Sequence, residues 1–195
     1  MPILTFASGS ASMHGAVVPI AKYVADGTTV SPSFNNIPQG YQDLMLVASV
    51  RSSGNTGSPV NLYILPNGDS SNNKSVTTLN GNGSSASSAR YTTSPFEYSA
   101  NVPTQQSAPY IFGTSTTHIL NYTNTTTYKT ILTRWASDFS GSGLTGINCV
   151  LYPYTTAITS LTAVVDGVVN LVAGSTFTLY GVRSIGQGVC ILLLR

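Results

Sequence analysis

The chain has 195 residues, only 7% of them charged, and a formal net charge of +2. This length suits one large domain rather than two. Ser, Thr, Asn and Gly supply about two-fifths of the residues, so the surface must be polar but carry few charges. The small net charge, without any run of Lys or Arg, argues against a nucleic-acid partner. A surface with little electrostatic repulsion between copies favours a permanent assembly or an extracellular protein.

Residues 1–15 are predicted to form an extended arm, followed by a single domain over residues 16–195. The arm combines three apolar residues with a run rich in Ser, Gly and Ala. A frayed terminus is the default for such a sequence, but we favour an arm held by a neighbouring subunit. The candidate assembly contacts of the arm are Ile3, Leu4 and Phe6.

The apolar run from Ala16 to Ala21 is the first segment that could be mistaken for a membrane or signal helix. It is interrupted by Pro19 and is far too short for either. We therefore expect no membrane partner and assembly in a cytoplasm. Beyond this run, Asp26-Gly27 supplies the positive φ angles of a tight turn, which predicts a hairpin between strands over 16–25 and 28–34.

The stretch from Asp43 to Arg51 predicts a central strand. Met45 and Val47 make the middle of one face apolar. The other face is apolar throughout and consists of Leu44, Leu46, Ala48 and Val50. Because both faces carry apolar residues, we expect this strand to be covered on both sides.

The most polar part of the chain, Asn72 to Thr93, predicts a long surface loop. Long loops in compact domains are uncommon unless they bind something, so this one is either an interface or receptor-facing element, or a mobile loop without a partner. The preceding Pro66-Asn67-Gly68-Asp69 predicts a turn. Residues 67–73 are as rich in oxygen as a calcium loop, but they lack its acidic spacing and its closing Glu. A plain turn is therefore favoured.

The second half of the chain alternates more regularly. Segments 116–122 and 128–136 are predicted to be paired antiparallel strands, the second with Ile131 and Trp135 on one side. Further strands are expected over 147–151, 158–165 and 175–182, and Asp166-Gly167 predicts a second hairpin. The inward residues of the strand over 158–165 are expected to be Leu161, Ala163 and Val165. In the strand over 175–182, Phe177 and Leu179 alternate with Thr and Tyr residues.

Many short strands separated by turns predict an all-β fold, an antiparallel β-sandwich of the jelly-roll type. A barrel is the alternative. The apolar run from Val189 to Leu194 would invite aggregation if it were exposed, so it must be buried in the domain or between subunits. Its candidate assembly contacts are Val189, Ile191, Leu192 and Leu193.

Groups that could perform catalysis are scarce, because the chain has only six carboxylates and two histidines. A glycosidase-like pair would have to combine distant residues such as Glu97 and Asp138, and nothing in their spacing favours it. His14 and His118 lack the spacing of a zinc site, and His118 is interpreted as a hydrogen-bonded structural histidine. We predict no catalytic residue, no metal site and no cofactor.

Cys149 and Cys190 are the only cysteines, so one disulfide is possible. Each lies in an apolar run, which favours two buried free thiols.

The tyrosines could form a carbohydrate-binding surface, because each offers a flat apolar ring and a hydroxyl group. Packing in the core or at an interface is the commoner use of such residues. The candidate glycan contacts are Tyr122, Tyr128, Tyr152 and Tyr154.

Three segments taken together carry a resemblance to known proteins. The first is Phe34-Asn-Asn-Ile-Pro-Gln-Gly-Tyr41, followed by Leu44, Leu46 and Arg51. The second is Asn121-Tyr-Thr-Asn124 with Lys129-Thr130, and the third is Ala157-Ile-Thr-Ser-Leu161 with Ala173-Gly-Ser-Thr-Phe-Thr-Leu-Tyr-Gly181. In order and spacing they resemble one family of bacteriophage virion proteins, which includes capsid decorations, head fibres and tail-associated proteins. The ends, 1–25 and 183–195, have no counterpart in this resemblance.

The resemblance implies a non-enzymatic component of the virion that forms a homotrimer. Since the chain carries little besides one family domain, we expect a capsid decoration or cement protein, or a head-fibre subunit, that contacts the major capsid protein. The alternative is a tail fibre or receptor-binding protein that contacts other tail proteins and recognises a host-surface glycan. A third possibility is an enzyme that cuts a surface polysaccharide.

Overall fold

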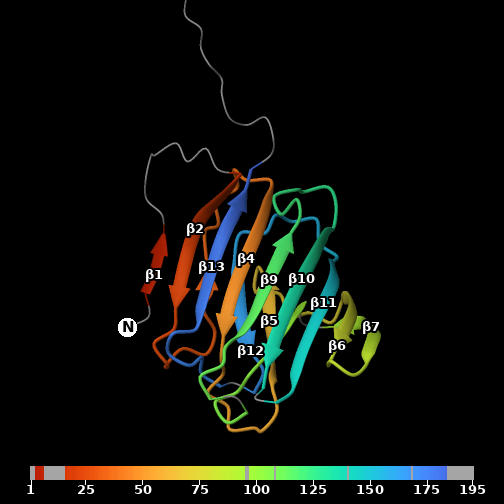
Figure 1. Cartoon of the computed structure of the whole chain (residues 1–195). Coiled ribbons are helices and arrows are strands. Elements are labelled where there is room, and N and C mark those ends of the chain that lie inside the picture. The colour runs from red at the N-terminus through yellow and green to blue at the C-terminus, as the bar shows by residue number, and fades with distance from the viewer. Residues whose placement is uncertain are drawn as a thin grey trace, which may run out of the picture.

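The computed structural model describes residues 3–6, 16–94, 97–107, 109–139, 141–167 and 169–183, without the side chains of 3–6 and 97–99. The described residues form only strands and connecting segments (Figure 1). The strands are β1 (Ile3–Phe6), β2 (Val17–Val24), β3 (Ser33–Phe34), β4 (Asp43–Val50), β5 (Val60–Pro66), β6 (Lys74–Gly81), β7 (Ala86–Ser94), β8 (Glu97–Val102), β9 (Gly113–Ile119), β10 (Lys129–Asp138), β11 (Gly143–Tyr152), β12 (Leu161–Val165) and β13 (Thr176–Val182).

Two antiparallel sheets pack face to face, which confirms the predicted β-sandwich. The larger sheet has nine strands in the order β1-β2-β13-β4-β9-β10-β11-β6-β7, and the smaller has four in the order β3-β12-β5-β8. Eight strands, β2-β13-β4-β9 facing β3-β12-β5-β8, make the double sheet of a jelly roll. The remaining strands are an edge strand, β1, and two additions to the β9 side of the large sheet.

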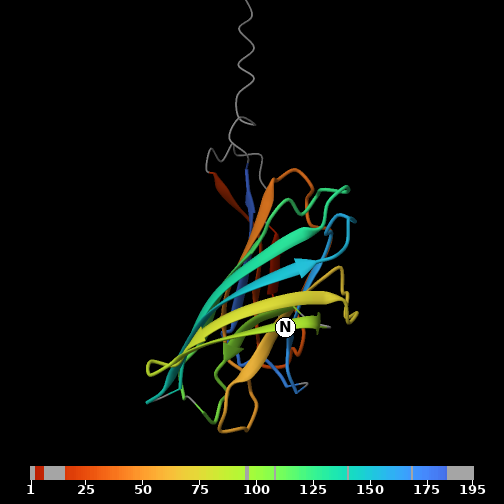
Figure 2. The same cartoon turned by 90° about the vertical axis from the view of Figure 1, so that its right-hand side faces the viewer.

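These two additions widen the large sheet beyond the jelly roll. The antiparallel strands β10 and β11 are inserted between β9 and β12, and the hairpin β6–β7 between β5 and β8. Figure 2 views this extension from the side of β7. β7 forms the outer edge, and its side chains are exposed on both faces until Ser94. β8 of the four-stranded sheet contacts β10, β11 and β6, so the part of the extension left uncovered on both faces is its outer strand, β7.

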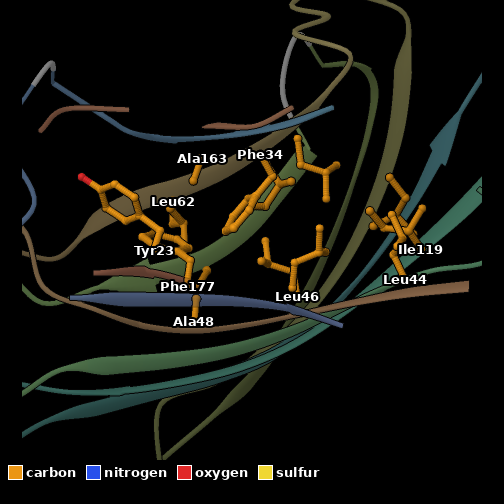
Figure 3. Close-up of a cluster of buried hydrophobic side chains, with 14 of the residues drawn as sticks. Tyr23, Phe34, Leu44, Leu46, Ala48, Leu62, Ile119, Ala163 and Phe177 are labelled. Atoms are coloured by element: carbon orange, nitrogen blue, oxygen red, sulfur yellow. The ribbon is translucent and has the colours of Figure 1, made fainter. Parts of the chain in front are cut away.

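The core fills the space between the two sheets (Figure 3). The expected alternation is confirmed on three strands. Every second residue of β4 is buried, from Leu44 to Val50, and so is every second residue of β12, from Leu161 to Val165. In β13 the buried residues include Phe177 and Leu179. Side chains that meet there include Leu44, Leu46, Ala48 and Phe177 from the large sheet and Phe34, Leu62 and Ala163 from the small one.

The second face of β4 differs from expectation. Met45 and Val47 are only half-buried, so β4 is covered on one side rather than on both. Their shielding comes from side neighbours in the same sheet, since Met45 lies between Tyr180 of β13 and His118 of β9. The four-stranded sheet packs on the opposite face.

Both predicted hairpins at Asp-Gly turns are wrong, although the turns exist. Gly27 and Gly167 have φ angles of 95° and 84°, as the dipeptides predicted. However, β2 pairs with β13 while β3 pairs with β12, and β12 and β13 also lie in different sheets. In a jelly roll most consecutive strands alternate between sheets, so these turns lead across the sandwich. The antiparallel pairing of β9 with β10 is confirmed.

The predicted long loop over 72–93 is also wrong, because most of it forms the hairpin β6–β7. Asn82 makes the turn: its Oδ1 accepts hydrogen bonds from the backbone N–H groups of Ser84 and Ser85, at 3.0 and 2.8 Å. Gly83 follows with a φ angle of 86°. The segment is polar because β7 is exposed on both faces, and this polar composition led to the prediction of a loop instead of a strand pair.

Two glycines of the large sheet have aromatic rings packed directly on their backbone. A Cβ atom at Gly146 would lie 2.7 Å from ring atoms of Trp135, its cross-strand partner. A Cβ atom at Gly181 would lie 2.3 to 2.5 Å from ring atoms of Tyr41. Each glycine therefore provides the room that its ring occupies.

The orientation of β11 overturns the prediction of a buried Cys149. The inward residues of β11 are Asn148, Val150 and Tyr152, whereas Cys149 is a free and exposed thiol. Ile147 and Leu151 share its outward face. Cys190 lies outside the described residues.

Candidate functional site

The loops at one end of the sandwich bring the three resemblance segments together. Two backbone hydrogen bonds of 2.9 Å join them, Ile37 N–H to Thr159 O and Ile158 N–H to Tyr122 O, and a third of 2.9 Å, Asn67 N–H to Ser160 O, ties the 66–69 turn to the same loops. We call residues 35–42, 120–128 and 153–160, with the 66–69 turn, the loop end. Segments that are far apart in the sequence thus form one connected surface.

The buried side chain of Lys129 forms hydrogen bonds with the backbone of the loop at residues 154–156. Its side chain is 1% exposed, and Nζ donates to the carbonyl oxygens of Tyr154, Thr155 and Thr156 at 3.1, 2.8 and 2.6 Å. All three ammonium protons therefore have an acceptor. Burial lowers the pKa of Lys129 below its ordinary value. Lys129 is thus a structural cap for residues 154–156.

Lys74 plays a comparable role beside the 66–69 turn. It is fully buried, and Nζ donates to Asp69 Oδ2 at 2.6 Å and to Ser71 O at 3.0 Å. Burial raises the pKa of Asp69, but hydrogen bonds from Lys74 and Ser71 outweigh it and hold the pKa below its ordinary value. The turn predicted here is confirmed, with Asn67 and Gly68 at φ angles of 52° and 67°. The side-chain oxygens of Asn67 and Asp69, which made this segment look like a calcium loop, accept hydrogen bonds from other residues of the protein.

The Asp69–Lys74 pair predicts a loss of stability in acid. Because the pKa of Asp69 is lower in the folded state than its ordinary value of 3.8, its contribution is present above that pH and is lost as the pH falls further. We expect Asp69→Asn to lower the free energy of unfolding by about 2 kcal/mol at pH 7. Urea unfolding should show this difference shrinking toward pH 2. Asp166→Asn, at an exposed position, is the control, and a difference that is independent of pH would contradict the prediction.

Of the four candidate glycan tyrosines, two have no exposed ring. Tyr122 and Tyr152 are 0% and 2% exposed, and their hydroxyl groups donate to the carbonyl oxygens of Pro38 and Pro66. Tyr154 is half-buried against Tyr152, with ring centroids 4.9 Å apart. Tyr122 and Tyr152 are therefore excluded as glycan contacts, and they take the commoner role, because their rings pack in the core. Tyr128 is 57% exposed.

A polar depression of about 380 Å³ lies between two loops of the loop end. It is lined by residues 39–42 of the segment before β4 and by Asn121, Thr123 and Asn124 of the segment after β9. We call it the loop depression. It contains residues of the first and second resemblance segments, and sequence reasoning did not single out its amide side chains.

The outward face of β10, β11 and β6 carries a second feature that sequence reasoning missed. Leu79, Ile147, Leu151 and Leu132 are 54, 46, 42 and 40% exposed. Ile147 is the cross-strand partner of Leu79, and Cys149 is the partner of Leu132. These five residues are contiguous, and we call them the apolar face.

The remaining candidate assembly contacts lie at the two ends of the chain. The backbone of Ile3 to Phe6 forms β1 and pairs with β2 at the edge of the large sheet. Val189, Ile191, Leu192 and Leu193 lie outside the described residues, as do His14 and the side chain of Glu97. His118 is half-buried on the outer face of β9, and its Nε2 has no hydrogen-bond partner among the described residues, contrary to expectation.

Neither a metal cluster nor a membrane helix occurs in the part of the chain that the structure describes. No three His, Cys, Asp or Glu residues gather there, and no helix in it is long and apolar enough to cross a membrane. Comparison with known proteins adds no relative: no protein-family model, curated protein or solved structure matches this chain.

Proposed function

We propose that this chain is a structural subunit of a bacteriophage virion, a capsid decoration or cement protein or a head-fibre subunit. The observation that carries the proposal is the apolar face. Monomeric soluble proteins rarely expose contiguous apolar patches larger than a few hundred Å², and clustered exposed aliphatic side chains often mark contacts with other proteins. Here four large aliphatic side chains, each at least 40% exposed, lie around an exposed thiol on the outward face of the sheet, and Arg134 is the cross-strand neighbour of Ile147 at the margin of this face.

The low charge of the chain supports the same proposal. With 7% charged residues, the protein has few charges to oppose the close approach of other subunits. β7 adds an open edge of nine residues, of which only Arg90 is charged. Long edges with few charges are templates for pairing with another chain. A permanent assembly would cover both surfaces.

The resemblance narrows this assembly to a virion. Its three segments lie apart in the sequence but meet at the loop end and on the adjoining strands, where Gly181 of the third segment packs under Tyr41 of the first. A jelly roll is also common in viral capsid proteins, although the fold alone does not fix a function. In this proposal the chain forms a homotrimer and binds the major capsid protein.

Labelling of particles tests the proposal directly. Virions purified from a lysed host should contain the chain in many copies, and gold-labelled antibody should decorate their heads. Decoration of tails would instead favour the tail fibre. Absence of the chain from purified particles would contradict a virion function altogether.

A charge on the apolar face should block assembly. We expect Ile147→Lys to fold, because this side chain is already 46% exposed, but to enter particles at least about tenfold less than wild type because a buried unpaired charge opposes association. Quantitative mass spectrometry of purified particles measures the effect.

The matched control is Gln105→Lys, which adds the same charge at an exposed position away from the sheets. It should enter particles as wild type does. In wild-type particles the thiol of Cys149 should also be protected from maleimide, relative to the free chain. Normal incorporation of Ile147→Lys would exclude this face as an interface.

A further inference from the structure

The loop depression has the size of a small-ligand site and carries no charge. Its volume of about 380 Å³ falls in the range of pockets for small molecules, about 300–1,000 Å³. Each lining side chain is neutral. The adjacent carboxylate of Asp43 is engaged, since its Oδ1 accepts the backbone N–H of Asn121 at 2.7 Å. The chemistry of the depression therefore favours a polar, uncharged ligand.

Two amides of the depression are held in fixed orientations. Gln39 Nε2 donates to the carbonyl oxygens of Ile37 and Ile158 at 2.8 and 3.1 Å, which leaves its Oε1 as an acceptor. Asn124 Oδ1 accepts the N–H groups of Thr126 and Thr127 at 2.7 and 2.9 Å, which leaves its Nδ2 as a donor. The depression thus offers one acceptor and one donor at defined positions, without a cost for ordering either side chain on binding.

Tyr41 adds an apolar surface that is also held in place. A Cβ atom at Gly181 would lie 2.3 Å from Cγ and 2.5 Å from both Cδ atoms of the ring, so Gly181 sits under the face of the ring rather than at its edge. Tyr41 also lines the depression. One face of the ring therefore rests on the backbone of β13, and the half-buried side chain still contributes to the wall of the depression.

We propose that the loop depression binds a neutral saccharide. A sugar ring has an apolar face of C–H groups that packs on an aromatic ring, and hydroxyl groups that both donate and accept hydrogen bonds. Tyr41, Gln39 Oε1 and Asn124 Nδ2 supply these three complementary elements. Gln42, which is exposed beside them, offers a further amide. This inference does not rest on the virion function, because it concerns the isolated chain.

Binding is tested on the full chain with glucose, galactose, mannose and N-acetylglucosamine as probes. Saturation-transfer NMR and calorimetry should detect saturable binding of at least one sugar. The changes in amide chemical shift should be confined to residues 39–42 and 121–124.

Asn124→Asp is the decisive variant. It keeps Oδ1 for the turn and replaces only the Nδ2 donor by an acceptor oxygen, so the fold is retained and binding should weaken at least about tenfold. The matched control is Asn82→Asp, since Asn82 makes the same type of turn in the β6–β7 hairpin and the charge change is identical. It should bind as wild type does.

Two results would overturn the proposal: no saturable binding of any of the four sugars, or equal binding by Asn124→Asp and wild type. Either would leave the incorporation of the chain into particles unaffected. Conversely, a chain that is absent from particles could still bind the sugar, so the two proposals fail separately.

Discussion

Replacing Lys129 by Met is expected to lower the free energy of unfolding by about 3 kcal/mol, because hydrogen bonds to charged groups contribute about 1.5–3 kcal/mol each and their loss is only partly made up by water. The Nζ of Lys129 donates to three consecutive carbonyl groups and is otherwise buried. Met has a similar length and keeps the apolar stem in place. The effect therefore isolates the ammonium group.

Lys22→Met is the matched control, because Lys22 lies on an exposed position of β2 in the same sheet. Its free energy of unfolding should stay within about 0.5 kcal/mol of wild type. Urea unfolding monitored by circular dichroism measures both variants. A Lys129→Met protein as stable as the Lys22→Met protein would show that the three carbonyl groups are satisfied by water instead.

Gly146→Ala is expected to destabilise the protein by about 2–3 kcal/mol, in the upper part of the usual range of about 1–3 kcal/mol for overpacking a buried site. The added methyl group would lie 2.7 Å from Trp135 and 2.5 Å from Asn80 Oδ1. Trp135 is 3% exposed and faces the core, so its large ring has little room to move. Thermal and urea unfolding should both report the loss.

A double-mutant cycle identifies the cause. In a Trp135→Leu background the cost of Gly146→Ala should fall below about 1 kcal/mol, since the smaller side chain removes the collision. Gly57→Ala provides the control for backbone effects, because nothing lies within 4 Å of its Cβ position. An unchanged cost in the Trp135→Leu background would assign the effect to Asn80 or to the backbone.

The apparent amphipathic pattern of β11 explains one failure of sequence reasoning. Ile147, Cys149 and Leu151 form its most apolar set, yet they face outward, and the inward set includes Asn148. Alternation defines two faces but does not say which one is buried when both carry apolar residues. Pairing with β10 decides which face of β11 is buried. Trp135 of β10 points inward and occupies the space beside Gly146, so Gly146 and every second residue after it also face inward. In this register Ile147, Cys149 and Leu151 lie on the exposed face of the sheet.

The loop end also contains features that the sequence could predict only in part. The buried Lys129 could have been noticed, since it shares the two-residue alternation of Ile131 and Trp135. The carbonyl groups that accept its hydrogen bonds could not have been predicted, because they lie 25 to 27 residues further along the chain in an irregular loop. The loop depression likewise combines residues 39–42 with residues 121–124. Such contacts depend on which strands are neighbours, and this is a property of the whole sheet.

What the sequence determined by itself was local: the all-β class, the inward residues of β4 and β12, and the turns at Gly27, Gly68 and Gly167. These follow from side-chain alternation and from the φ angles that glycine permits, which involve only a few adjacent residues. The tertiary structure alone decided that the Asp-Gly turns cross between sheets, that 74–94 form a hairpin and that Cys149 is exposed. Strand pairing joins residues that are distant in the sequence, so the apolar face and the loop depression arise only once the nine-stranded sheet is complete.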